Sequence, residues 1–157
     1  MTELNIGSLV PDFEAPATGD KTFKLSTLRG KNIVLYFYPK DNTPGCIKEG
    51  QDFRDNYSQF EELNTLIVGV SRDSIKVHEN FKSKQLFPFD LLSDTEEQLC
   101  QLFDVIKMKN MYGRKVRGIE RSTFLIDTDG RLVQKWRKVK VNTHIEEVLH
   151  AIRELGL

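Results

Sequence analysis

The sequence predicts an α/β protein in which helices cover both faces of a central mixed β-sheet. Three runs rich in β-branched and aromatic residues, at 32–38, 65–71 and 123–127, are typical of buried strands. A turn signal then precedes a further run at 132–141, which predicts a hairpin. Because helical patterns separate the first strands, the chain order indicates a mixed sheet flanked by helices.

Helical periodicity fills the intervals between the predicted strands. Apolar or small residues recur at steps of three and four along 46–63, which predicts one face of a helix. Shorter helices are expected at 74–84 and 95–103. The closing helix is expected to begin at a capping box formed by Thr143 and Glu146.

Composition limits the class of protein. A length of 157 residues favours a single domain, 1–157. Lys and Arg total 23, as do Asp and Glu, so the net charge is zero and no nucleic-acid partner is expected. The longest apolar run, 33–38, falls far short of the ~20 residues that span a bilayer, so no membrane partner is expected.

Cysteine content and the N-terminus bear on the compartment. The first residues show no basic and apolar segments of a secretory signal. Two cysteines are too few for a disulfide framework, and their separation does not suit a zinc site. We therefore expect a cytoplasmic location in which both cysteines begin as thiols.

One segment departs from the even balance of charge. Residues 107–121 hold six basic side chains and one acidic side chain. Such a run could bind an anion or RNA, but Tyr112 is its only aromatic residue, which leaves little for bases to stack on. We expect a solvated loop here.

The most informative stretch follows the first predicted strand. Pro39 breaks the strand, and Thr43 and Pro44 suit the first positions of a helix. Cys46 then falls in the first turn, where free backbone N–H groups and the positive end of the helix dipole favour an anion such as a thiolate. This position predicts a reactive cysteine, although a buried structural thiol would also fit the apolar stripe.

The pattern Pro39-x-x-x-Thr43-x-x-Cys46 resembles the active-site motif of peroxiredoxins. The longer run FYPKDNTPGCIKE, together with RSTFLID at 121–127, is similar to the bacterioferritin comigratory protein (Q-type) subfamily. The resemblance extends from about Val10 to the final helix. It implies a thioredoxin-like fold and a thiol-dependent peroxidase that reduces hydrogen peroxide or organic hydroperoxides.

The resemblance also assigns roles to individual residues. It makes Cys46 the peroxidatic nucleophile, which a hydroperoxide oxidises to a sulfenic acid. Thr43 would hydrogen-bond the peroxide and the sulfur, and Arg121 would supply a permanent positive charge with fixed donors. Pro39 would shield the pocket from water, and Glu49, one turn after Cys46, would orient Arg121. Without this resemblance, the sequence around Arg121 would predict an ordinary surface arginine beside Glu120.

The sequence departs from the subfamily at one position. Many members carry a resolving cysteine five residues after the peroxidatic one, where this chain has Gln51. The only other thiol, Cys100, lies among apolar residues and is expected to be a buried hydrophobic side chain rather than a resolving partner. We therefore expect a one-Cys cycle completed by an external thiol, and ready overoxidation of Cys46.

The implied chemistry uses no metal, flavin or haem. Its electrons come from thioredoxin, glutaredoxin or a small thiol, and the resemblance favours a monomer. Two alternatives stay open at this point. One is a non-enzymatic thioredoxin-fold holdase or redox-relay module; the other is a disulfide oxidoreductase, which Thr43 disfavours because it stands where a CxxC pair would have its first cysteine.

Overall fold

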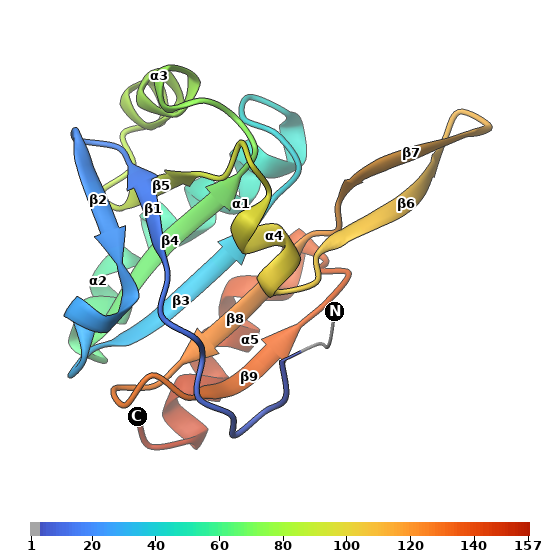
Figure 1. The fold of residues 1–157 in the computed structure, drawn as a ribbon. Coiled ribbons are helices and arrows are strands. Elements are labelled where there is room, and N and C mark those ends of the chain that lie inside the picture. Colours follow the sequence, from blue (N-terminus) through green and yellow to red (C-terminus); the bar gives the residue numbers. More distant parts are fainter. Residues whose placement is uncertain (1–3) are drawn as a thin grey trace.

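A computed structural model describes residues 4–157 and contains one seven-stranded sheet in the order β2-β1-β5-β4-β3-β8-β9 (Figure 1). The central strands β3 (Asn32–Phe37), β4 (Thr65–Ser71) and β5 (Asp90–Ser93) are parallel to one another, and the remaining pairings are antiparallel. The outer strands are β1 (Glu14–Ala17), β2 (Lys21–Lys24), β8 (Ser122–Ile126) and β9 (Leu132–Trp136). The predicted mixed sheet is confirmed.

Helices cover both faces of this sheet. They are α1 (Pro44–Asp55), α2 (Tyr57–Glu62), α3 (Ile75–Gln85), α4 (Gln98–Leu102), α5 (Val141–Glu154) and the 3-10 turn η1 (Leu25–Leu28). In the view of Figure 1, α4 lies in front of the sheet and α5 behind it. Among residues 4–157, no helix has both the length and the apolar character that a membrane span requires.

The central strand β3 divides the interior into two cores. All its residues are buried, and alternate side chains point to opposite faces. Leu35 and Phe37 pack with α4 and η1 in the first core. Val34 and Tyr36 pack with α1, α2, α3 and α5 in the second core. A buried, two-faced strand of this kind explains the uninterrupted apolar run in the sequence.

Two helix predictions required correction. The helix expected along 46–63 is two helices, because the Asn56 side chain donates to the Asp52 carbonyl oxygen at 2.8 Å and closes α1 there. The capping box of Thr143 and Glu146 is wrong. Helix α5 begins at Val141, so Thr143 already lies inside its first turn and donates to Glu147 at 3.5 Å.

Strand and helix ends were also corrected in the second half of the chain. The strand expected along 132–141 ends at Trp136, because Lys138 adopts a left-handed φ of 50° that a strand cannot continue through. The helix expected along 95–103 shortens to α4, whose backbone begins after Glu97 at a φ of 61°. The prediction for 74–84 is confirmed by α3, where the Ser74 hydroxyl accepts from the Val77 N–H.

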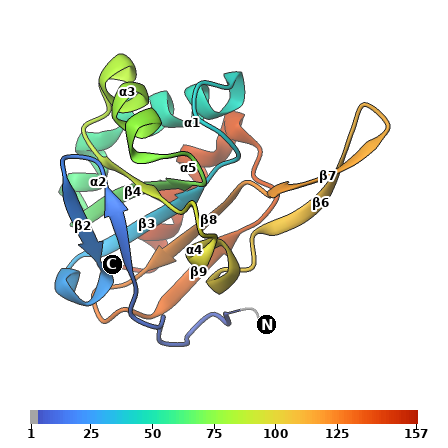
Figure 2. The same cartoon turned by 45° about the horizontal axis from the view of Figure 1, so that its top comes forward.

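The solvated loop expected along 107–121 is wrong. Strands β6 (Ile106–Met111) and β7 (Arg114–Ile119) pair as a separate antiparallel hairpin that projects from the body in both views (Figures 1 and 2). Its two turn residues, Tyr112 and Gly113, have φ values of 53° and 78°, as a type I′ turn requires. Turn geometry rather than an apolar pattern therefore organises this segment.

The close contact between α1 and the segment after α3 yields a stability prediction. A Cβ atom on Gly50 would overlap the ring of Phe87. Overpacking costs ~1–3 kcal/mol, and overlap with several atoms of the buried Phe87 ring places this site in the upper part of that range, ~2–3 kcal/mol, against roughly 1 kcal/mol gained by replacing a helical glycine with alanine. We expect Gly50→Ala to lower the free energy of unfolding by about 1–2 kcal/mol in chemical denaturation. Ser83→Ala, at an exposed position in α3, is the control; an unchanged value for Gly50→Ala would contradict the prediction.

Candidate active site

Cys46 lies at the start of α1, on the second-core side of the sheet. The chain leaves β3, turns through 39–43 and enters the helix with Thr43 as N-cap and Pro44 in the first turn. Cys46 is also in that turn and only 2% exposed. The unpaired backbone N–H groups at the positive end of α1 are therefore in the same turn as a nearly buried thiol.

Arg121 comes from another part of the chain and meets this sulfur. It stands between β7 and β8, and its Nη2 donates to Cys46 Sγ at 3.3 Å. A Cβ atom on Gly45 would lie 3.1 Å from the same nitrogen, so the small residue before Cys46 allows the guanidinium to approach the first turn. The structure thus brings together Cys46 and Arg121, which are 75 residues apart.

The other side of the guanidinium contacts a buried carboxylate. Nη1 of Arg121 donates to Oε1 of Glu49 at 2.5 Å, and the Glu49 side chain has no solvent exposure. Burial raises the pKa of Glu49 to about 7, although the charge and hydrogen bond of Arg121 act to lower it. Its second oxygen, Oε2, has no hydrogen-bond partner among residues 4–157. The contact that the resemblance implied between Glu49 and Arg121 is present.

Thr43 and Pro39 both lie on the loop that precedes α1. The Thr43 hydroxyl donates to the Lys40 carbonyl oxygen at 2.8 Å rather than to Cys46. This bond closes the loop, and the hydroxyl oxygen retains capacity to accept a hydrogen bond. Pro39 is half-buried at the first position after the segment that continues β3. Pro39, Thr43 and Cys46 thus lie on one loop and the helix that follows it, and Arg121 joins them from a later part of the chain. Among these four predicted site residues, the direct hydrogen bond is between Cys46 and Arg121.

A buried network that the sequence did not reveal braces the same loop. Asp41 accepts from the Tyr38 hydroxyl at 2.6 Å and contacts His78 Nδ1 at 2.6 Å. His78 Nε2 lies 2.8 Å from the Leu92 carbonyl oxygen, which can only accept, so Nε2 carries a proton. The Asp41 backbone N–H donates to Asp73 at 2.9 Å. In the sequence, this network shows only as an aspartate, Asp41, two residues before the N-cap of α1. Its partner His78 lies 37 residues away, so no local pattern connects the two.

Oxygen and nitrogen atoms of Asp41, Asp73 and His78 lie within 4.8 Å of one another, which is close enough to consider a metal ion. However, these donors already have protein partners. Both ring nitrogens of His78 are bonded, and Asp73 accepts from the Ser71 hydroxyl as well as from the loop backbone. The network is satisfied without an ion and acts as a brace between the loop, β4 and α3.

Cys100 lies in the other core. It is fully buried on α4, in the cluster that contains Leu35 and Phe37. Burial and the neighbouring carboxylate of Asp94 raise the pKa of this thiol far above its usual value, which disfavours the thiolate. Because Cys46 packs with the second core, the sheet separates the two cysteines, and both are free thiols.

Gln51 occupies the position at which the subfamily often has its resolving cysteine. Its Nε2 donates to Gln85 Oε1 at 3.0 Å, and Arg54 donates to the Gln85 carbonyl oxygen at 2.8 Å. A polar contact between α1 and α3 therefore replaces any disulfide chemistry at this position.

Comparison with known proteins agrees with this geometry. Residues 6–135 match the AhpC/TSA family. The chain is 51% identical over 153 residues to "Peroxiredoxin Bcp" of Bacillus subtilis, covering 98% of each chain. A cysteine-to-serine mutant of Xylella fastidiosa PrxQ superposes with a TM-score of 0.93 at 45% identity and covers 100% of both chains.

A further solved structure bears on activity. A Xanthomonas campestris bacterioferritin comigratory protein, described in terms of its alkyl peroxide reduction, superposes with a TM-score of 0.90 at 47% identity over 98% of both chains. Together with the sheet order and the flanking helices, these matches confirm the thioredoxin-like fold. The chain belongs to the AhpC/TSA family and is a thiol-dependent peroxidase of the peroxiredoxin type.

Proposed function

We propose that Cys46 is the peroxidatic nucleophile and that this enzyme works by a one-Cys cycle. The contact between Arg121 Nη2 and Cys46 Sγ, 3.3 Å at the positive end of α1, is the observation that carries the assignment. A helix N-terminus and a guanidinium both stabilise a negative charge on the same sulfur atom. Cys100 also lies in the first turn of a helix, the short α4, but its backbone N–H is bonded to the carboxylate of Asp94, and burial and that carboxylate raise the pKa of its thiol.

The first step transfers one oxygen atom to sulfur. The Cys46 thiolate attacks the terminal oxygen of the hydroperoxide ROOH, the S–O bond forms and the O–O bond breaks. Sulfur loses two electrons and becomes a sulfenic acid, and RO⁻ leaves and takes up a proton to give ROH. Hydrogen peroxide gives water by the same route.

Three side chains support this step. Negative charge develops on the leaving oxygen, and Arg121 stabilises it with donors that are already in place. Removing one such donor typically costs about 10²–10³ in rate. The Thr43 hydroxyl, held on the Lys40 carbonyl oxygen, accepts a hydrogen bond from the bound peroxide, and Pro39 shields the pocket from water.

Glu49 is a positioning residue in this proposal. It holds one nitrogen of Arg121 while the other nitrogen faces Cys46, so the guanidinium has a fixed orientation. Because Glu49 has no exposure to solvent, its carboxylate is only weakly screened and strongly affects the guanidinium charge felt at Cys46.

The sulfenic acid is reduced by an external thiol. That thiol attacks the Cys46 sulfur, an S–S bond forms, the S–O bond breaks and water leaves. A second thiol then attacks the mixed disulfide at the reductant's sulfur and releases reduced Cys46, which returns the two electrons. We infer that the donor is thioredoxin, glutaredoxin or a small thiol, and that the enzyme works as a monomer in the cytoplasm, where thiols are kept reduced.

The assignment of the two cysteines is tested by substitution. Cys46→Ser should abolish peroxide consumption, because an alcohol is not ionised at neutral pH and is a far weaker nucleophile. Cys100→Ser should keep most of the turnover with dithiothreitol as reductant, and Cys100→Ala is a second variant if the buried hydroxyl destabilises the fold. Circular dichroism checks that each variant is folded. A stoichiometric Cys46–Cys100 disulfide after one equivalent of peroxide, detected by intact mass, would overturn the one-Cys cycle.

Overoxidation should be easy without a nearby resolving thiol. With excess hydrogen peroxide and no reductant, we expect Cys46 to gain two or three oxygen atoms while Cys100 stays reduced. Peptide mass spectrometry measures both positions. Adding dithiothreitol together with the peroxide is the control and should protect Cys46. Lasting resistance of Cys46 without reductant would point to a resolving thiol in the protein.

The raised pKa of Glu49 makes stability depend on pH. Because its pKa is about 7 in the folded protein and 4.5 ordinarily, the folded state binds more protons between these values, and its stability should fall as pH rises through 7. At about 1.4 kcal/mol per pH unit, the loss is at most about 3–4 kcal/mol. Burial lowers the pKa of His144 to about 4, which makes stability rise over the same range, so the effect of Glu49 is measured as a difference between two variants. Denaturation at several pH values should show Cys46→Ser losing stability relative to Cys46→Ser/Glu49→Gln as the pH rises from 4.5 to 7. Glu146→Gln, an exposed position on α5, is the control; a difference between the two variants that does not change with pH would contradict the prediction.

A further inference from the structure

The β6–β7 hairpin, residues 106–119, forms an arm that packs against the rest of the chain only at its base (Figures 1 and 2). Ile119 at the base is buried in the first core, whereas Tyr112 in the turn is 99% exposed. A two-stranded hairpin is marginally stable by itself in water. An element of this kind that extends into solvent is best explained by something that binds to it.

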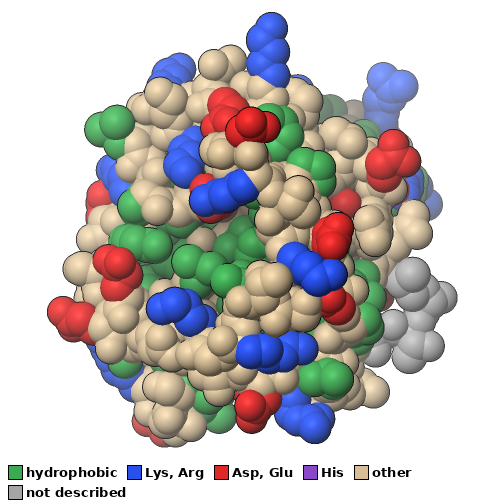
Figure 3. Space-filling model, turned by 60° about the vertical axis from the view of Figure 1, so that its left-hand side comes forward, with side chains coloured by type: hydrophobic (Ala, Val, Ile, Leu, Met, Phe, Trp, Pro, Cys, Tyr) green, Lys and Arg blue, Asp and Glu red, His purple; other side chains and the backbone are tan. Residues whose placement is uncertain are grey.

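The arm carries charge of only one sign. It contains five basic residues and no acidic residue: Lys107, Lys109, Arg114, Lys115 and Arg117. At the base, Lys107 pairs with Asp104 and Arg117 with Glu97. Arg114 and Lys115, next to the turn, form no ion pair with any of residues 4–157. By contrast, the face in Figure 3 mixes Lys and Arg with Asp and Glu around apolar side chains.

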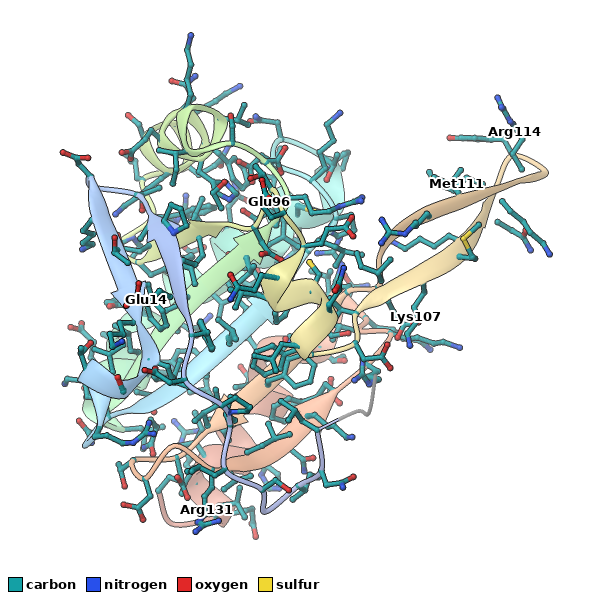
Figure 4. All side chains as sticks on the ribbon, in the orientation of Figure 1. Glu14, Glu96, Lys107, Met111, Arg114 and Arg131 are labelled. Carbon is teal, nitrogen blue, oxygen red and sulfur yellow. The ribbon has the colours of Figure 1, made fainter. Side chains whose placement is uncertain are left out.

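Apolar side chains stand between these cations. Met108 is 62% exposed, and Met111 and Val116 are also exposed. The strand register places Lys109 opposite Val116 and Met111 opposite Arg114, so all four share one face of the arm. Figure 4 shows Met111 and Arg114 at the far end, with Lys107 nearer the body. Exposed Met, Tyr and Arg side chains are typical of protein interfaces.

The arm is connected directly to the active site. Strand β7 ends at Ile119, two residues before Arg121, the side chain that contacts Cys46. Burial and the positive charge of Arg121 lower the pKa of Lys109 on strand β6. This part of the arm therefore lies in the electrostatic field of the site. A molecule bound along the arm would therefore approach Cys46.

We propose that the arm is the docking element for the reductant, and that the reductant is a protein thiol presented on an acidic surface. This inference rests on the proposed one-Cys cycle, in which an external thiol must reach Cys46. Six strand residues extend for roughly 20 Å, so a small thiol at Cys46 cannot also contact Arg114 and Lys115. A second arm is excluded as the occupant, because two arms of equal positive charge repel one another.

The test separates the two halves of the cycle. Protein oxidised with one equivalent of hydrogen peroxide is mixed with reduced thioredoxin, reduced glutaredoxin or dithiothreitol, and rapid quenching with intact-mass detection follows loss of the Cys46 sulfenic acid. The variant Arg114→Glu/Lys115→Glu should slow reduction by at least one of the protein thiols by about tenfold or more, because electrostatic attraction of this kind raises association rates by 10–10³. Its oxidation by peroxide and its reduction by dithiothreitol should match the wild type.

Matched controls keep the result specific to the arm. Lys76→Glu/Lys84→Glu makes the same charge change on exposed positions of α3 and should leave reduction by the protein thiols unchanged. In the wild type, added salt should slow reduction by the protein thiols but not by dithiothreitol.

Four outcomes would overturn the proposal: an arm variant that behaves like the wild type with both protein thiols, equal slowing by the α3 variant, reduction by dithiothreitol but by neither protein, or micromolar binding of single-stranded oligonucleotide to the arm at physiological salt. Failure of Cys46 to form a sulfenic acid in the wild type would instead refute the proposed function.

Discussion

The active site depends on one constraint: a single partly buried guanidinium contacts both a sulfur atom and a carboxylate. Arg121 contacts Cys46 with one nitrogen and Glu49 with another, and both partners lie on α1. The protein largely shields these three ionisable groups from water. They therefore interact strongly, because the effective dielectric constant around them is low. In the proposed mechanism Arg121 stabilises negative charge at this sulfur, so the elements that position Arg121 also bear on the chemistry of Cys46.

The sheet register fixes Arg121. Phe37 of β3 pairs with Ser122 of β8, so the residue before Ser122 lies at the level where β3 gives way to the loop of α1. Slipping this pairing by one residue would turn the side chain of Arg121 to the opposite face, away from Cys46. A second bond holds the same backbone, since Val139 N–H donates to the Arg121 carbonyl oxygen at 3.0 Å. The loop on the other side is held by Asp41 and His78, so both partners of the central contact are anchored independently.

The features that could be predicted from sequence are those with a local signal. The apolar runs of β3, β4 and β8, the helical pattern of α3, and the helix start before Cys46 each lie within about ten residues of sequence. The hairpin of β6 and β7 was missed because its alternation of apolar and polar residues, Ile106 to Lys109, lasts for only four residues. Its turn residues Tyr112 and Gly113 are also not among the usual type I′ pairs. The His78–Asp41 contact and the raised pKa of Glu49 arise from burial, which a single sequence does not display.

The division of the interior by the sheet explains why the two cysteines differ and supports the proposal of an external reductant. Helix α1 places Cys46 beside a guanidinium, whereas the core around α4 places Cys100 beside the carboxylate of Asp94, which together with burial raises the pKa of the Cys100 thiol. A disulfide between them would require both sulfur atoms on one side of β3, which means unfolding α1 or α4. The proposed reduction by an external thiol avoids that cost. In that cycle the reductant is selected by the surface around Cys46 and not by a second cysteine within the chain, and β7, whose first four residues are exposed, leads directly into Arg121.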